Sequence, residues 1–111
     1  MAQHIYRVVV RGEFADLDPA VREALLAEVD AHDLTLSSYT AAGTFTYEPR
    51  LHAFSFRYEV RRIADDDTTE SECAAAAASQ GEALARAYLD ERAITFKRLR
   101  STTVNMADMW N

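Results

Sequence analysis

The stretch His52–Arg62, with the sequence HAFSFRYEVRR, decides the fold. Apolar and polar residues alternate along it with a period of two, which indicates a β-strand with one buried face. The buried side would carry Phe54, Phe56, Tyr58 and Val60. The opposite side would carry Ser55, Arg57, Glu59 and Arg61. A chain with a net charge of −6 thus places arginine along one side of a strand, and the reason must lie in what that side faces.

Length and cysteine content limit the chain to one domain with an ordinary hydrophobic core. Its 111 residues are 49% hydrophobic, as expected for a single domain over residues 1–105 and a C-terminal tail over 106–111. The single cysteine, Cys73, cannot form an internal disulfide. No apolar run is long enough to span a bilayer or to act as a signal segment. We therefore expect a cytoplasmic protein with no membrane partner.

Three further segments have the alternation of strands. Residues 4–12 and 96–105 each read as a strand, and the segment GTFTYE at 43–48 forms a hairpin with 51–62. The sequence therefore predicts four strands.

Two segments have helical periodicity. Asp18 is the expected N-cap of a helix over 19–32, and Thr68 or Thr69 is the expected N-cap of a helix that ends near Glu91. The face of the second helix that packs on the sheet is predicted to carry Cys73, Ala76, Ala77, Gln80, Leu84, Ala87 and Tyr88. Its many alanines favour helix.

The predicted order of elements is β-α-β-β-α-β, the ferredoxin-like arrangement of an α+β fold. One antiparallel four-stranded sheet would carry both helices on one face and leave the other uncovered. The strand order across the sheet would be fourth, first, third, second. Two such sheets that face each other would form a dimeric α+β barrel, which is an open alternative.

Charge is divided between the two layers of this fold. The helical segments 18–33 and 65–92 hold 13 acidic and 3 basic residues, whereas the strand segments hold 3 acidic and 9 basic residues. Period two places six arginines on the uncovered face: Arg7, Arg11, Arg57, Arg61, Arg98 and Arg100. Arginine suits the bidentate binding of carboxylate or phosphate. The alternative is a solvated sheet face with arginine stems lying along it.

Four segments resemble a family of small actinobacterial proteins that carry a domain of unknown function. They are YRVVVRGEF (Tyr6–Phe14), GTFTYE, FSFRYE and, near the C-terminus, DMW. The resemblance covers nearly the whole chain and contains no catalytic signature. It implies no established activity, cofactor or substrate, so it assigns no role to any residue.

Most other kinds of site find no support in the sequence. His4, His32 and His52 lack the spacing of a metal site, and the acidic segment 64–72 lacks the glycine and the alternation of a calcium loop. There is no glycine-rich phosphate loop and no nucleophile motif. Tyr47 and His52 remain as candidates for cofactor-free acid–base chemistry. We therefore expect no metal and no cofactor.

Nucleic-acid binding is disfavoured by the direction of the aromatic rings. RNA-recognition domains of this topology stack bases on aromatic residues of the exposed sheet face. Here Tyr6, Phe54, Phe56 and Tyr58 are predicted to face the helices, and the acidic bulk would repel phosphate. We expect no nucleic-acid partner.

These observations lead to two hypotheses. In the first, the chain is a binding or assembly module for a small anionic metabolite. Arg7, Arg57 and Arg98 would gather the anion, and Trp110 in the tail would close over the site. An outer ring would consist of Arg11, Arg61 and Arg100.

In the second hypothesis, the chain is a cofactor-independent enzyme of the dimeric α+β barrel type that oxidises, isomerises or cyclises a small metabolite. We also expect a homodimer through the open sheet face or a free strand edge; the alternative is that the tail folds back on its own sheet. The open face carries apolar Ile5 and Val9, and the tail carries Met106, Met109 and Trp110, so a monomer would expose apolar surface.

Overall fold

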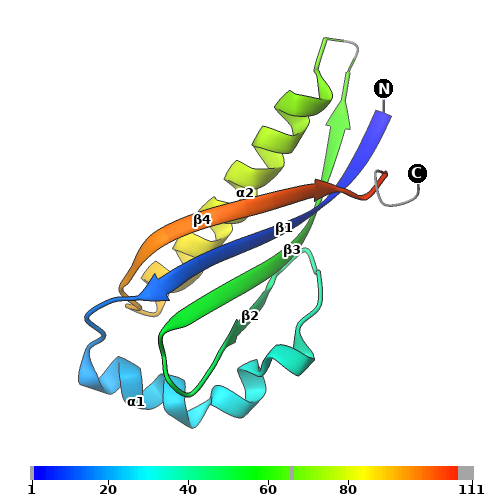
Figure 1. Cartoon of the computed structure of the whole chain (residues 1–111). Coiled ribbons are helices and arrows are strands. Elements are labelled where there is room, and N and C mark those ends of the chain that lie inside the picture. Colours follow the sequence, from blue (N-terminus) through cyan, green and yellow to red (C-terminus); the bar gives the residue numbers. More distant parts are fainter. Residues whose placement is uncertain (1, 66, 108–111) are drawn as a thin grey trace.

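The computed structural model describes residues 2–65 and 67–107, which form one antiparallel four-stranded sheet and two α-helices (Figure 1). In chain order the elements are β1 (Ala2–Phe14), α1 (Pro19–Ala27), η1 (Val29–His32), η2 (Leu34–Leu36), β2 (Thr44–Tyr47), β3 (Ala53–Ala64), α2 (Glu70–Glu91) and β4 (Phe96–Asn105). The strand order across the sheet is β2-β3-β1-β4. The predicted α+β class and the four strands are confirmed.

The face of the sheet toward α2 is apolar, as predicted. Seven side chains of this face are at most 3% exposed: Tyr6, Val8, Val10, Phe54, Phe56, Tyr58 and Val60. Pairs such as Val8 with Tyr58 and Val10 with Phe56 lie directly opposite each other on β1 and β3. A register shift of one residue would turn these side chains to the other face, so burial holds the register in place.

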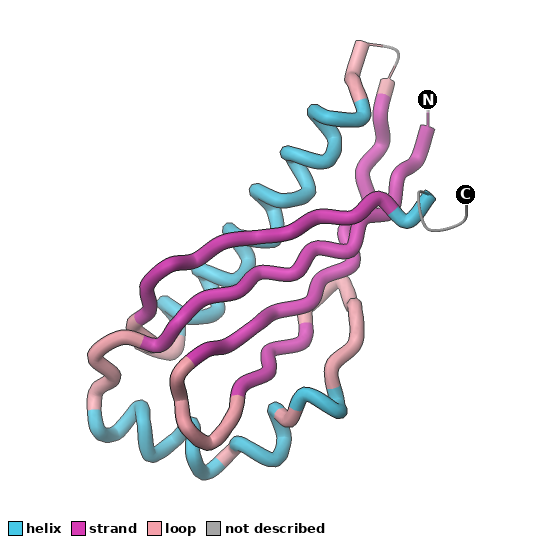
Figure 2. The backbone as a smooth tube through the Cα atoms, in the orientation of Figure 1, coloured by secondary structure: helices cyan, strands magenta, loops and turns pink. Residues whose placement is uncertain are grey.

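α2 lies along the sheet and contacts β1, β3 and β4 (Figure 2). The predicted packing face is partly wrong, since the predicted Leu84 is 40% exposed. The buried residues instead recur every four positions: Cys73, Ala77, Gly81, Ala85 and Leu89. These mostly small residues bring the helix close to the sheet, because a Cβ atom on Gly81 would lie 2.8 Å from Cγ1 of Val8.

The first helix is shorter than predicted. Asp18 is its N-cap, and its carboxylate accepts a hydrogen bond from the Ala20 N–H at 2.9 Å. α1 nevertheless ends at Ala27, and the 3-10 turns η1 and η2 follow. Asp33 caps η2 by accepting from the Thr35 N–H at 2.8 Å. Such an aspartate cap offers the backbone an alternative to a continuous helix, so the segment turns along β2.

α1 reaches the core only at one end of the sheet (Figure 1). Leu25 is buried there, and its carbonyl accepts a hydrogen bond from the Tyr47 hydroxyl at 2.6 Å. The expected layer of two helices over one face is therefore present in part, with α2 as the helix that covers the strands. Within residues 2–65 and 67–107, no helix has both the length and the apolar character that crossing a bilayer requires.

Candidate ligand-binding groove

The predicted inner trio of arginines is spread along the open face of the sheet, which is the face opposite α2. Arg7 lies near the middle of β1, Arg57 is opposite Val9, and Arg98 lies beside Glu13. These positions span five to six residues of β1, which is roughly 17 to 20 Å of strand. Register therefore keeps Arg7, Arg57 and Arg98 from converging on one point.

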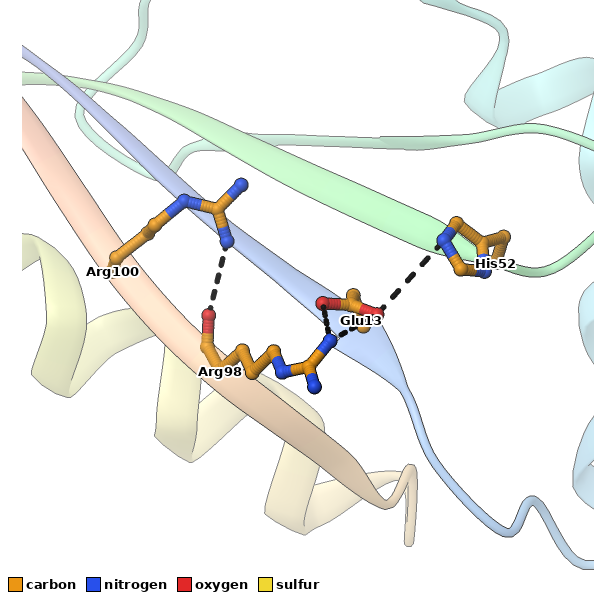
Figure 3. A network of polar contacts seen from close by, with 4 residues as sticks. All are labelled: Glu13, His52, Arg98 and Arg100. Carbon is orange, nitrogen blue, oxygen red and sulfur yellow. Dashed lines mark hydrogen bonds and ion pairs between the residues drawn. The ribbon is translucent and has the colours of Figure 1, made fainter.

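Glu13 at the end of β1 pairs with one of the six arginines. Arg98 lies at a β-bulge with φ of 56°, and its Nη1 donates to Oε2 of Glu13 at 3.1 Å. Nε2 of His52 lies 3.9 Å from Oε1 of the same carboxylate (Figure 3). The hydrogen bond from Arg98 holds the pKa of Glu13 below its ordinary value. Ionised Glu13 thus neutralises Arg98.

Two further arginines have partners elsewhere on the open face. Nη2 of Arg61 lies 3.2 Å from Oε1 of Glu59. The guanidinium carbon of Arg7 lies 4.7 Å from the centre of the Tyr39 ring, which is a cation–π contact. The loop after η2 brings this tyrosine to β3, where the Glu59 N–H donates to the Thr40 carbonyl at 2.8 Å. Both arginines are therefore engaged within the chain.

Arg57 contacts a pair of hydroxyl groups on neighbouring strands. Oγ1 of Thr46 and Oγ of Ser55 are 2.9 Å apart, and Nη1 of Arg57 donates to Ser55 at 3.3 Å. Thr46 is only 3% exposed although it lies on the face away from α2; Ser55 and Arg57 contact its hydroxyl, and η1 and η2 lie beside β2. Residues of η1 and η2 thus lie close to the β2 side of the face expected to be uncovered.

Arg11 and Arg100 lie directly opposite each other on β1 and β4. Both are exposed, and among the described residues neither has a carboxylate within ion-pair distance. Nη1 of Arg100 donates to the Arg98 carbonyl at 3.2 Å (Figure 3), which orients its guanidinium group. Of the six predicted arginines, the strand register brings this pair together.

The two arginines line a groove of about 610 Å³ at one end of the open face. The hydroxyl-bearing Thr46 and Ser55 also line it, and η1 and η2 contribute Val29 and Leu34. A volume of this size lies within the usual range for small-molecule sites. The acidic and imidazole side chains of the lining are Glu13, Asp30, Asp33, Glu48 and His52.

Tyr47 and His52, the two predicted acid–base candidates, differ in whether their side chains are free to contact a ligand. The Tyr47 hydroxyl donates to the Leu25 carbonyl, and burial raises the pKa of Tyr47 to about 12. It is therefore engaged in holding α1 to the sheet. His52 lies at the rim of the groove with its side chain 73% exposed, near Glu13.

A second, smaller cavity of about 240 Å³ lies on the helix side of the sheet. Phe45, Phe56 and Tyr88 line it, together with His32. Nδ1 of His32 lies 2.9 Å from the Phe45 carbonyl oxygen, so this imidazole is already hydrogen-bonded. The open-face groove offers more polar groups to a ligand.

Sequence reasoning missed several residues that shape the groove. The alternation of GTFTYE carries the signal for Thr46 on the open face, but nothing in the sequence shows that η1 and η2 would bring Val29 and Leu34 beside it. Trp110, the predicted lid, lies outside the described residues. Within the described ranges, no group of three or more His, Cys, Asp or Glu side chains could hold a metal ion.

Comparison with known proteins gives one match. Residues 1–110 match the family described as Family of unknown function (DUF6204). The chain belongs to this family. Membership in DUF6204 confirms the resemblance to a family of unknown function and assigns no activity to the groove. No curated protein and no solved structure matches the chain.

Proposed function

We propose that this DUF6204 protein binds a small anionic molecule, through a carboxylate or phosphate group, at Arg11 and Arg100. The observation that carries the proposal is that Arg11 and Arg100 lie directly opposite each other on β1 and β4 and both line the groove, with no acid among the described residues at ion-pair distance. Like charges directly opposite each other in a sheet repel. A bound anion would remove this repulsion, and the planar arginine fork suits such a group.

The hydroxyl groups of the groove support the same function. Ser55 and Thr46 lie on β3 and β2, and Arg57 holds them from the neighbouring position. Hydroxyls donate and accept hydrogen bonds, so they would orient the ligand once the arginines have bound its charge. The competing explanation is that Arg11 and Arg100 are only solvated, and it predicts no saturable binding.

The test is isothermal titration calorimetry with inorganic phosphate and with succinate. We expect Arg11→Gln and Arg100→Gln each to weaken binding at least about tenfold, which corresponds to ~1.4 kcal/mol. Arg22→Gln is the matched control, because Arg22 is exposed on α1 and does not line the groove. Wild-type protein without saturable binding at millimolar concentration, or a groove variant that binds like the control, would contradict the proposal.

We also infer a ferredoxin-like topology that forms a homodimer through the open face. The βαββαβ order and the strand order β2-β3-β1-β4 support the topology. Ile63 on β3 and Val104 on β4 support the dimer, since they lie on the open face at 69% and 42% exposure. Ile63 lies opposite Gln3 at the far end of β1 and Val104 lies opposite Arg7 near its middle; neither residue lines the groove, so a partner could cover them without filling it.

Analytical ultracentrifugation over the micromolar range tests the dimer. We expect the wild type to sediment as a dimer and Ile63→Asp to sediment as a monomer. Arg22→Asp changes charge on α1 and should leave the dimer intact. A wild-type monomer at every concentration would refute the dimer and leave the ligand proposal standing.

The enzyme hypothesis remains a prediction, and the contact between His52 and Glu13 is what favours it. Imidazole is the side chain most often used for proton transfer, and a carboxylate partner orients it. The two groups are 3.9 Å apart at the rim of the groove. If the protein is an enzyme, His52→Gln should abolish turnover of a bound ligand without changing the affinity for that ligand.

A further inference from the structure

The groove has two walls of opposite charge. Arg11 and Arg100 form the wall on the β1 and β4 side. The wall on the β2 side is acidic and comprises Asp30 in η1, Asp33 between η1 and η2, and Glu48 after β2. The β3 residue Ser55 lies between the walls. A ligand that carried only negative charge would meet the arginines on one side and repulsion on the other.

The negative charges of this wall are not paired with basic side chains of the described residues. No basic side chain among the described residues lies within ion-pair distance of Asp30, Asp33 or Glu48. Hydrogen bonds from Thr35 lower the pKa of Asp33, so its carboxylate stays ionised near neutral pH. Glu13, the fourth acid of the lining, differs because Arg98 already pairs with it.

We propose that the ligand of the groove is a zwitterion, with its anionic group at Arg11 and Arg100 and an ammonium group at the Asp30 and Glu48 wall. This inference rests on the proposed function and adds the second charge. β2 and β1 are separated by one strand, so their backbones are about 10 Å apart. Val29 and Leu34 also line the groove and suit a short apolar spacer. A small ω-amino carboxylate has this chemistry.

The experiment compares three ligands of equal carbon skeleton: 6-aminohexanoate, hexanoate and hexylamine. Calorimetry on the whole chain should show 6-aminohexanoate binding at least about tenfold more tightly than either single-charge analogue. The double variant Asp30→Asn, Glu48→Gln should reduce this preference to below about threefold while it retains binding of inorganic phosphate. Glu23→Gln is the control, because Glu23 is exposed on α1 and outside the groove.

The outcomes distinguish failure of the zwitterion inference from failure of the proposed anion site. Equal affinity of the wild type for hexanoate and 6-aminohexanoate, with phosphate still bound at Arg11 and Arg100, would overturn the zwitterion and leave the anion site. A preference that survives in the double variant would also overturn it. Absence of phosphate binding by the wild type would overturn the anion site itself.

Discussion

The two faces of the sheet are built from alternate residues of the same strands, yet their side chains meet different surroundings. On the face toward α2, Val8, Phe56 and Tyr58 are at most 1% exposed. On the open face, Arg11 and Arg100 lie opposite each other and are exposed. Alternation assigns a side chain to a face, whereas register and the neighbouring loops decide what it contacts there.

This difference separates stability from binding. Buried apolar area contributes about 25 cal/mol per Å² to folding, whereas exposed charge pairs contribute little. We therefore expect substitutions on the helix-facing side to change the free energy of unfolding. Substitutions around the groove should change binding and leave that free energy nearly constant.

The largest effect should come from Phe56→Ala. Phe56 on β3 is 1% exposed and contacts Tyr88 of α2, so truncation should lower the free energy of unfolding by ~3–5 kcal/mol. Thr102→Ala is the open-face control, since Thr102 is exposed opposite Val9. It should change stability by less than about 0.5 kcal/mol. Urea denaturation measures both, and equal losses would break the distinction between the faces.

Gly43→Ala should have the next largest effect. Gly43 has φ of +90°, and a Cβ atom there would lie 2.1 Å from Cε1 of Tyr58. The strained backbone alone should cost ~1–3 kcal/mol. Ala42→Ser changes the neighbouring exposed residue and should be nearly neutral. A Gly43→Ala protein with wild-type thermal stability would show that Gly43 does not lie as close to the Tyr58 ring as the structure has it.

Tyr47→Phe should have a smaller effect that depends on pH. Loss of the hydrogen bond to the Leu25 carbonyl should cost ~0.5–1.5 kcal/mol at pH 7. Burial raises the pKa of Tyr47 from 10.0 to about 12, so its contribution is complete below pH 10 and is lost as the pH rises toward 12.

Chemical denaturation between pH 7 and pH 12 should therefore give a shallower alkaline decline for Tyr47→Phe than for the wild type. The decline should not vanish, because burial also raises the pKa of Tyr58. Identical slopes for the two proteins would mean that Tyr47 is not held in its neutral form.

The smallest effect should come from Arg98→Ala on the open face. Removal of the hydrogen bond should let the pKa of Glu13 rise toward its ordinary value of 4.5. A lowered carboxyl pKa stabilises the fold above the ordinary pKa, and this contribution is lost as the pH falls. NMR titration of the Glu13 side chain measures the change, with Arg61→Ala as a control. An unshifted Glu13 in Arg98→Ala would mean that the pair does not persist.

The sequence predicted those features of the fold that depend on a local pattern of residues. Period two placed Phe54, Phe56 and Tyr58 in the core, and Asp18 marked the start of α1 by its capping chemistry. The packing face of α2 could not be read correctly, because a run of alanines gives no contrast between its sides. α1 ends at Ala27 and not near His32, and Asp33 caps η2, the second of the two 3-10 turns that follow, where its carboxylate competes with further helix.

The candidate site was less predictable because it depends on relations between distant residues. Alternation indicated that the six arginines share a face, but the bulge at Arg98 and its pairing with Glu13 depend on the register of β4 against β1. The contact of Arg7 with Tyr39 depends on a loop whose path no local pattern reveals. Opposition of Arg11 and Arg100 likewise follows only once the register is known.

The most direct test of the central claim is a two-dimensional amide NMR titration of the wild-type protein with inorganic phosphate. We expect saturable shifts at Gly12, Ser55 and Arg100, which line the groove. The amides of Ala77 and Ala85, buried where α2 packs on the sheet, should stay unchanged. Shifts that centre on α2, or no saturable shift at the groove, would contradict an anion site at Arg11 and Arg100.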